Sequence, residues 1–102
     1  MSVSELQISK EQNGSTLTVY LTGEVNTITA KDLEEALSSI NCQELVLDFE
    51  NLDYITSAGI RVLLAVNSNL KDSGGTICII NANDEIREIF DVVGLYNTFF
   101  KA

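Results

Sequence analysis

Apolar and polar residues alternate in two short stretches near the start of the sequence. Leu6 and Ile8 precede the turn-forming residues 13–15 (Asn-Gly-Ser), and the alternation resumes over residues 17–21. A period of two residues is typical of half-buried strands, and Asn-Gly is a strong hairpin-turn sequence. We therefore expect two antiparallel strands joined by this turn.

The period changes to that of a helix over residues 26–40. Leu33 and Leu37 fall on one helical face, and charged residues lie between them. Thr27 or Thr29 would cap the start of this helix, because a threonine hydroxyl can accept a hydrogen bond from its first free N–H groups.

Two later stretches, residues 44–49 and 76–80, are short and almost continuously apolar. Such runs are typical of strands covered on both faces, as in parallel sheets. Each is followed by a helical pattern. The first runs from about Ser57 to Asp72, and the second begins after Asn83, a residue suited to a helix cap.

Glycines mark the expected ends of these two helices. Gly74 or Gly75 suits the left-handed conformation that closes the first one. In the second, Val93 continues the apolar face, Gly94 follows, and Leu95 is placed for the hydrophobic contact of a Schellman motif.

The order strand-strand-helix-strand-helix-strand-helix predicts an α/β fold. Alternating strands and helices imply right-handed crossovers and a mainly parallel central sheet, which the opening hairpin makes mixed. We expect four to five strands packed with helices, and a single domain over residues 1–102, since no linker, repeat or proline divides the chain.

Composition narrows the possible functions. The net charge is −9 with only 6 Lys and Arg residues, which disfavours nucleic acid and anionic membrane surfaces as partners. There is no histidine and the 2 cysteines, Cys42 and Cys78, are far apart. We expect buried free thiols, no metal and no cofactor. No signal peptide or membrane-spanning run is evident, so we expect a cytoplasmic protein without membrane insertion.

The junction between the second apolar strand and its helix carries the candidate chemistry. If Ser57 caps the helix, its hydroxyl lies beside free N–H groups at the positive end of the dipole, where a phosphate is favoured. Ala58 and Gly59 would leave the approach clear, and the Arg61 guanidinium could reach an oxyanion on Ser57.

Simpler explanations exist for each of these residues. Ser57 is also compatible with an ordinary cap, Arg61 with a solvated charge paired with Asp53, and Gly59 with close packing. Residues 60, 63 and 64 form the expected core face of the helix. A second apolar face is either more deeply buried or a partner contact, and it contains Val62, Ala65, Val66 and Asn69.

Three segments together resemble the STAS domain family (sulfate transporter and anti-sigma factor antagonist), specifically its stand-alone bacterial anti-sigma factor antagonists. They are LTGEVNTITAKDLEEAL, LVLDFENLDYITSAGIRVLL and GGTICIINANDEIREIFDVVGLYNTF, and they cover nearly the whole chain. The second segment is similar to the family signature, in which Asp-Ser-Ser-Gly opens a helix. Ser57 matches the first serine, and Thr56, Ala58 and Asn26 stand where the family usually has Asp, Ser and Asp.

The resemblance implies a phosphorylation switch. The unphosphorylated protein would bind a serine-kinase anti-sigma factor and release the sigma factor. Phosphorylation at Ser57, or at Thr56 as second choice, would abolish binding, and a phosphatase would reset the protein. The implied partner-binding residues are Asn26, Thr56, Ser57, Ala58, Gly59, Arg61 and Val62.

Two other classes of function can be weighed against the sequence. A ligand-binding or transporter-accessory module of the same fold would work without phosphorylation, and the non-acidic Asn26 and Thr56 are compatible with it. An enzyme is disfavoured, because the sequence has no histidine base, no Cys-His arrangement and no glycine-rich phosphate loop.

Overall fold

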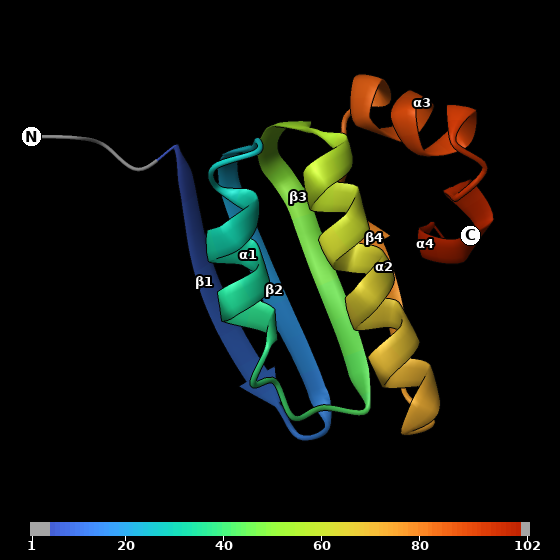
Figure 1. Cartoon of the computed structure of the whole chain (residues 1–102). Coiled ribbons are helices and arrows are strands. Elements are labelled where there is room, and N and C mark those ends of the chain that lie inside the picture. Colours follow the sequence, from blue (N-terminus) through green and yellow to red (C-terminus); the bar gives the residue numbers. More distant parts are fainter. Residues whose placement is uncertain (1–4, 101–102) are drawn as a thin grey trace, which may run out of the picture.

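A four-stranded sheet forms the centre of the computed structural model, which describes residues 5–100 (Figure 1). Residues 1–4 lie outside this range, and they are part of the N-terminal segment that we expect not to be a signal peptide. The strands follow one another in space in chain order, and only the first pair is antiparallel. The mixed, mainly parallel sheet is therefore confirmed. Its strands are β1 (Leu6–Asn13), β2 (Thr16–Val25), β3 (Glu44–Ile55) and β4 (Thr76–Ile80).

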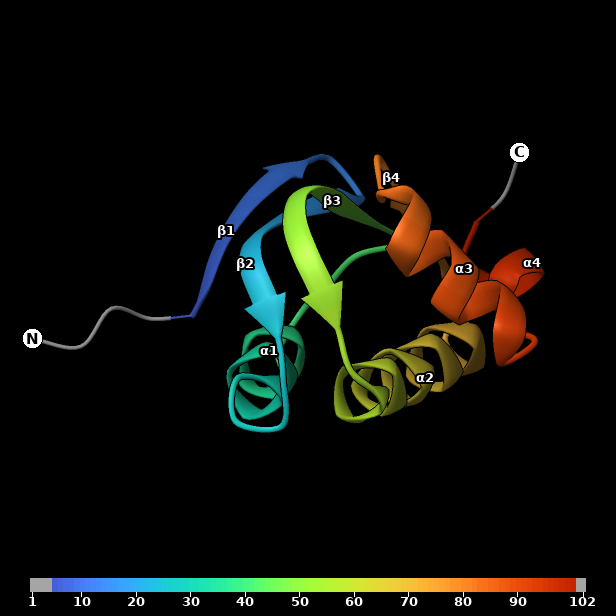
Figure 2. The ribbon, with the colours of Figure 1, turned by 90° about the horizontal axis from the view of Figure 1, so that it is seen from above.

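Helices α1 (Ala30–Leu37) and α2 (Ser57–Asp72) lie side by side on one face of the sheet (Figure 2). Helix α3 (Asp84–Val92) and the short α4 (Tyr96–Phe99) lie beyond β4. The sequence pattern gave no indication of α4, because a single turn is too short to show a helical period. Within residues 5–100, no helix is long and apolar enough to cross a membrane.

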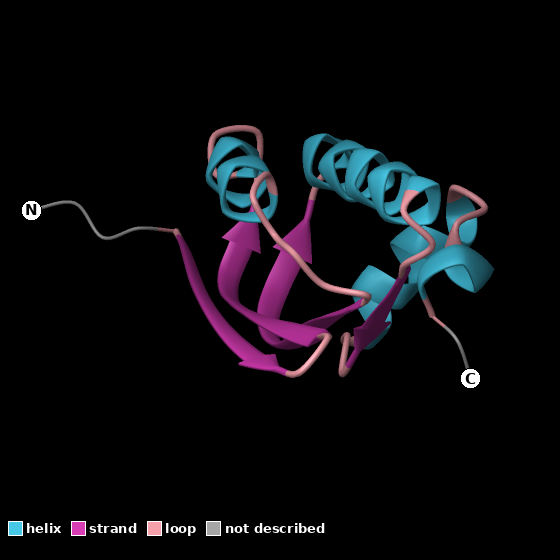
Figure 3. Cartoon of the chain, turned by 90° about the horizontal axis from the view of Figure 1, so that it is seen from below, coloured by secondary structure: helices cyan, strands magenta, loops and turns pink. Residues whose placement is uncertain are grey.

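The other face of the sheet carries no helix (Figure 3). Along β3, Leu45 and Leu47 are fully buried beneath the helices, while Val46 and Asp48 between them are only half-buried. The prediction that residues 44–49 and 76–80 are covered on both faces is therefore wrong. A continuous apolar run indicated two covered faces, but here the outward-facing apolar residues stay partly exposed.

Strand β3 is twice as long as predicted. Its pairing with β2 continues past Tyr20–Asp48, through two register shifts, to Val25–Ile55. The added residues include the charged Glu50 and Asp53, both exposed, so their polarity resembles that of a loop. Backbone pairing with β2, rather than side-chain pattern, extends the strand to the edge where α2 begins.

Left-handed glycines follow the ends of α2 and α3, as predicted. Gly74 and Gly94 have φ of 80° and 78°, and the N–H group of Leu95 donates to Phe90 O at 2.8 Å, as a Schellman motif requires. Val93 is 53 % exposed, however, so its placement in the core is wrong. Helix α3 ends at Val92, and the chain turns away before the next position of the apolar face.

Cys42 and Cys78 form no disulfide within residues 5–100, and both are half-buried rather than fully buried as expected. Partial burial raises the pKa of the Cys42 thiol, because the thiolate is less well solvated there.

Candidate functional site

Two loops meet at the edge of the sheet where the parallel strands end. One joins β2 to α1, and the other joins β3 to α2 (Figure 1). Val25 pairs with Ile55 at the strand ends, and the N–H group of Thr56 donates to the Val25 carbonyl at 2.8 Å. The fold thus brings the predicted residues of both loops to one place, as expected for the carboxyl ends of parallel strands.

Ser57 is the first residue of α2 rather than its cap. The prediction that Ser57 caps the helix is therefore wrong by one position, since Thr56 holds the extended backbone of the N-cap with φ of −95° and ψ of 172°. Ser57 is exposed, and its hydroxyl forms no hydrogen bond with any described residue. A free hydroxyl at the surface is accessible to a modifying enzyme.

Thr56 has the opposite environment. Its hydroxyl oxygen is buried and has no hydrogen-bond partner within residues 5–100. A threonine at an N-cap usually accepts from the first turn, but this side chain makes no such bond. Because the oxygen is inaccessible, an incoming phosphoryl group would reach Ser57 far more easily than Thr56.

The start of α2 therefore has unsatisfied hydrogen-bonding capacity. No side chain caps it, and its first turn contains no acidic residue. The first N–H groups of a helix lack partners within the helix and form the positive end of its dipole. An anionic group on the Ser57 oxygen would lie next to these donors, where negative charge is stabilised.

Gly59 faces inward from the same turn. A Cβ atom at this position would lie 2.5 Å from Val25 Cγ1 and 2.8 Å from Ile55 Cγ1. Both distances are far shorter than ordinary contacts, so only glycine lets the helix approach the strand ends this closely. Gly59 is buried and Ala58 is half-buried, so these residues contribute packing more than exposed surface.

Arg61 lies one turn after Ser57 and is exposed. It forms no ion pair with Asp53 or with any other residue in the described part of the chain. Leu64 continues the same outward stripe at i, i+4 and i+7 from Ser57, and it is 38 % exposed. Its predicted core position is wrong, whereas Val66 from the second apolar face is buried and Val62 is half-buried.

Asn26 organises the neighbouring loop. Its Oδ1 accepts hydrogen bonds from the N–H groups of Ile28 and Thr29, each at 2.9 Å, and so caps the turn that leads into α1. Its Nδ2 donates to Glu24 at 3.2 Å and to Glu5. An aspartate could not donate to these carboxylates, so an asparagine suits this site. Thr29 occupies the N-cap position of α1, the second of the two predicted, but its hydroxyl accepts no hydrogen bond from the helix. It accepts one from the N–H group of Asn26 at 2.8 Å instead.

The sequence reasoning missed Ile28. This side chain is 75 % exposed in the loop beside the one that leads to Ser57. An isoleucine between two threonines in a loop is the only signal that the sequence contains. Large exposed apolar side chains next to a polar site often mark a protein contact.

No group of three or more His, Cys, Asp or Glu residues within residues 5–100 is placed to hold a metal ion. The candidate site consists of the Ser57 hydroxyl, the free N–H groups at the start of α2 and the exposed apolar side chains of Leu64 and Ile28.

The family follows from a comparison with known sequences. The STAS domain family model matches residues 7–101, so the chain belongs to the STAS domain family. BtrV of Bordetella bronchiseptica is 31% identical over 97 residues, which cover 92% of this chain and 84% of that protein. The anti-sigma F factor antagonist of Paenibacillus polymyxa is 28% identical over 95 residues, covering 89% and 81%.

Solved structures share the fold. The anti-sigma factor antagonist SpoIIAA in its unphosphorylated form has a TM-score of 0.78 at 20% identity, covering 94% of this chain and 88% of that chain. The Bacillus cell fate determinant SpoIIAA in its phosphorylated form has a TM-score of 0.75 at 20% identity, covering 94% and 91%. At this identity the likeness establishes the fold, α/β with a four-stranded mixed sheet.

Proposed function

We propose that this protein is an anti-sigma factor antagonist that is switched off by phosphorylation of Ser57. Its similarity to proteins named as such antagonists supports the general function. One of its structural neighbours has been solved in both phosphorylated and unphosphorylated forms.

One observation carries the choice of Ser57. Its hydroxyl is exposed and forms no hydrogen bond with residues 5–100, none of whose side chains caps the helix that it begins, while the neighbouring Thr56 hydroxyl is buried. A serine-kinase anti-sigma factor would transfer the γ-phosphoryl group of ATP to the Ser57 oxygen. The bond from the γ-phosphorus to the bridging oxygen would break, ADP would leave, and the hydroxyl would lose its proton. A phosphatase would hydrolyse the phosphoester and restore the free serine.

The partner surface would surround this hydroxyl. Arg61 and Leu64 extend along the same outward stripe of α2, and Ile28 is exposed in the adjacent loop. Exposed apolar side chains supply area that a partner can bury, and Arg61 suits a carboxylate or a backbone carbonyl. Asn26 would act from behind this surface by shaping the loop that presents Ile28.

The switch follows from charge. A phosphate adds about −1.5 to −2 charges at neutral pH. Within the domain, the free N–H groups at the start of α2 would accommodate it, so the fold should persist. At the interface the same charge would have to lose its water without a matched partner, which weakens binding.

Binding measurements on two substitutions test the proposal. We expect Ser57→Ala to bind the anti-sigma factor of the same organism as tightly as the wild type. Ser57→Asp should bind at least about tenfold more weakly, a loss of about 1.4 kcal/mol, as measured by calorimetry. Thr56→Val serves as the matched control and should bind normally. Equal affinities for the alanine and aspartate variants would contradict the proposal.

A further inference from the structure

The sheet face opposite α1 and α2 is the open face of the molecule (Figure 3). Parallel sheets almost always carry helices on both faces, yet β2, β3 and β4 are parallel and carry them on one. The main side chains of the open face are Glu11 on β1, Tyr20 on β2, Glu44, Val46 and Asp48 on β3, and Cys78 and Ile80 on β4.

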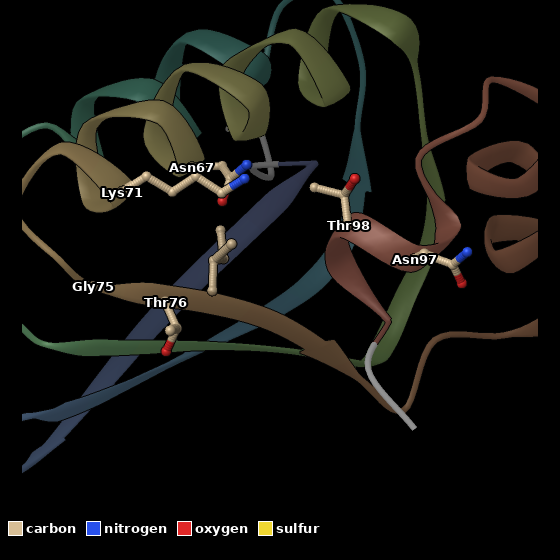
Figure 4. Close-up of a pocket in the computed structure, with 7 residues that line it drawn as sticks. Asn67, Lys71, Gly75, Thr76, Asn97 and Thr98 are labelled. Carbon is tan, nitrogen blue, oxygen red and sulfur yellow. The ribbon is translucent and has the colours of Figure 1, made fainter.

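The direction of these side chains follows from the strand alternation. Each of them lies next to a buried residue that faces the helices or at an even spacing from one that does. Figure 4 shows Thr76 of β4 pointing away from α2, whereas Lys71 lies on the α2 side of that strand. Because the open face lies across the sheet from α2, it does not depend on the proposed role of Ser57.

The open face has an apolar centre. Tyr20 and Ile80 are 39 % and 40 % exposed, and Val46 and Cys78 are half-buried. Val46 pairs with Cys78 across β3 and β4, so their side chains are neighbours. Three adjacent strands thus leave apolar area in water that a second layer could bury.

Three carboxylates accompany this centre, and their hydrogen bonds come from neutral donors. The Tyr20 hydroxyl donates to Glu11 at 3.1 Å, and the Thr16 hydroxyl donates to Glu44 at 3.1 Å. Asp48 accepts from the backbone N–H group two residues later at 2.9 Å. None of the three forms an ion pair within residues 5–100, so these contacts position the carboxylates without neutralising them.

The pKa of the Tyr20 phenol reflects this negative charge. The hydrogen bond to Glu11 and the charge of that carboxylate raise the pKa most, and partial loss of water and the charge of Asp48 raise it further. Carboxylates from β1 and β3 therefore act together on a side chain that lies between them.

The cations of residues 5–100 all lie elsewhere. Lys10 on β1 points to the helix side of the sheet, where its Nζ donates to the Ala36 carbonyl at 2.6 Å. The others belong to helices: Lys31 to α1, Arg61 and Lys71 to α2, and Arg87 to α3. The open face is thus acidic without a compensating cation, and its charge selects a basic partner. A second copy of this chain would place carboxylates against carboxylates.

We propose that the open face binds a basic amphipathic helix of another protein. The apolar stripe of that helix packs on the apolar centre, and the lysine and arginine side chains that flank the stripe pair with Glu11, Glu44 and Asp48. A helix is about 10–12 Å across, and two strand spacings, the width from β2 to β4, are about 10 Å. The docked helix supplies the second layer that the parallel strands lack.

NMR titration of the ¹⁵N-labelled full chain with a synthetic peptide tests this proposal. The peptide is helical and about 18 residues long, or about five turns, with leucine on one face and lysine on both sides of it. One comparison peptide has glutamate for every lysine, and another has glutamine for every leucine. At low ionic strength we expect saturable shifts centred on Val46 and Cys78, and at least about tenfold lower affinity for each comparison peptide.

Substitutions of equal charge locate the binding. One triple variant removes the three charges of the open face but keeps the hydrogen-bond acceptors: Glu11→Gln, Glu44→Gln and Asp48→Asn. The matched control removes three exposed charges from α1: Asp32→Asn, Glu34→Gln and Glu35→Gln. The first should weaken binding at least about tenfold and the second by less than about twofold. Ile80→Ser should also weaken binding, whereas Val92→Ser, at an exposed valine of α3, should not.

Three results would overturn the proposal: shifts centred on α1 or α2, equal weakening by the two triple variants, or equal affinity for the glutamate peptide. Sedimentation of the protein alone tests a second copy as the occupant. We expect the same molecular mass for the wild type and Ile80→Ser. A wild-type dimer that Ile80→Ser dissociates would mean that a copy of this chain covers the open face, and the proposal would be wrong.

Discussion

Helices α2 and α3 both begin just after a parallel strand ends, yet their first turns differ in every polar feature. Asn83 caps α3 by accepting from the N–H group of Ile86 at 2.8 Å, and Asp84 and Glu85 place two carboxylates in its first turn. At the start of α2 the cap residue Thr56 makes no such bond, and no acidic residue follows it.

This difference shows which of the two helix starts receives hydrogen-bond acceptors and negative charge from its own chain. In α3, the chain itself supplies an acceptor for the Ile86 N–H group and two carboxylates near the positive end of the dipole, so this helix start contributes stability. The start of α2 has the free donors and lacks the negative charge, and it presents Ser57 next to them. A phosphate on Ser57 would supply to α2 what Asp84 and Glu85 already supply to α3.

Gly59→Ala is expected to have the largest effect on the free energy of unfolding. Helix propensity alone would favour alanine by about 1 kcal/mol. Instead we expect a loss of about 2 kcal/mol, because the added Cβ would overlap Val25 and Ile55 in the core. Thermal unfolding should show a fall of about 4–8 °C for each kcal/mol. Ser68→Ala, at an exposed position of the same helix, is the control and should not destabilise. A rise in melting temperature for Gly59→Ala would refute the close approach.

Asn26→Asp is expected to lower the free energy of unfolding by a smaller amount. It tests which interactions hold the loop between β2 and α1. The aspartate would lose the donors to Glu5 and Glu24 and place a third carboxylate beside them. We expect a cost of about 1–2 kcal/mol at neutral pH, from lost hydrogen bonds and like-charge repulsion.

This deficit should shrink at high salt. Screening weakens the repulsion among the three carboxylates, so the difference from the wild type should fall as the ionic strength rises. Urea unfolding at low and high ionic strength measures it. Asn41→Asp, at an exposed position, is the control. A deficit that stays the same at both ionic strengths would show that the carboxylates do not interact.

Removing each cap directly tests the contrast between the two helices. Asn83→Ala should lower the free energy of unfolding by about 1 kcal/mol, because it removes a cap. Thr56→Val should be neutral or slightly stabilising, since it replaces a buried hydroxyl that has no partner with a methyl group of similar size. Equal losses for the two variants, measured by urea unfolding, would mean that both helix starts are capped alike.

The smallest effect is expected from Ser57→Asp on stability. A carboxylate in the first turn of α2 should add about 0.3–1 kcal/mol at low ionic strength, and the gain should disappear at high salt. Ser68→Asp places the same charge in the middle of the helix and should give no gain. The aspartate variant would then be more stable than the wild type but a weaker binder, a combination that general damage to the fold cannot produce.

Much of the fold could be predicted from periodicity. The spacing of Leu33 and Leu37, the alternation in the opening hairpin and the glycines after α2 and α3 each reflect a local requirement of the backbone. The length of β3 could not be predicted, because pairing with β2 overrides the polar character of Glu50 and Asp53. The face of α2 that packs inward also depends on its neighbours, which explains the error at Leu64.

The candidate site was predictable in its location but not in its detail. The strand end, the serine and the glycine pointed to residues 56–61. The burial of the Thr56 hydroxyl arises only from tertiary packing, so the sequence could not separate it from Ser57.

Phosphate mapping tests the central claim most directly. The wild type, Ser57→Ala and Thr56→Val would each be incubated with ATP and a lysate of the source organism, and peptides spanning residues 53–64 analysed by mass spectrometry. We predict one phosphate on Ser57 in the wild type and in Thr56→Val, and none in Ser57→Ala. A phosphate on Thr56, or on this peptide of the Ser57→Ala variant, would contradict the account.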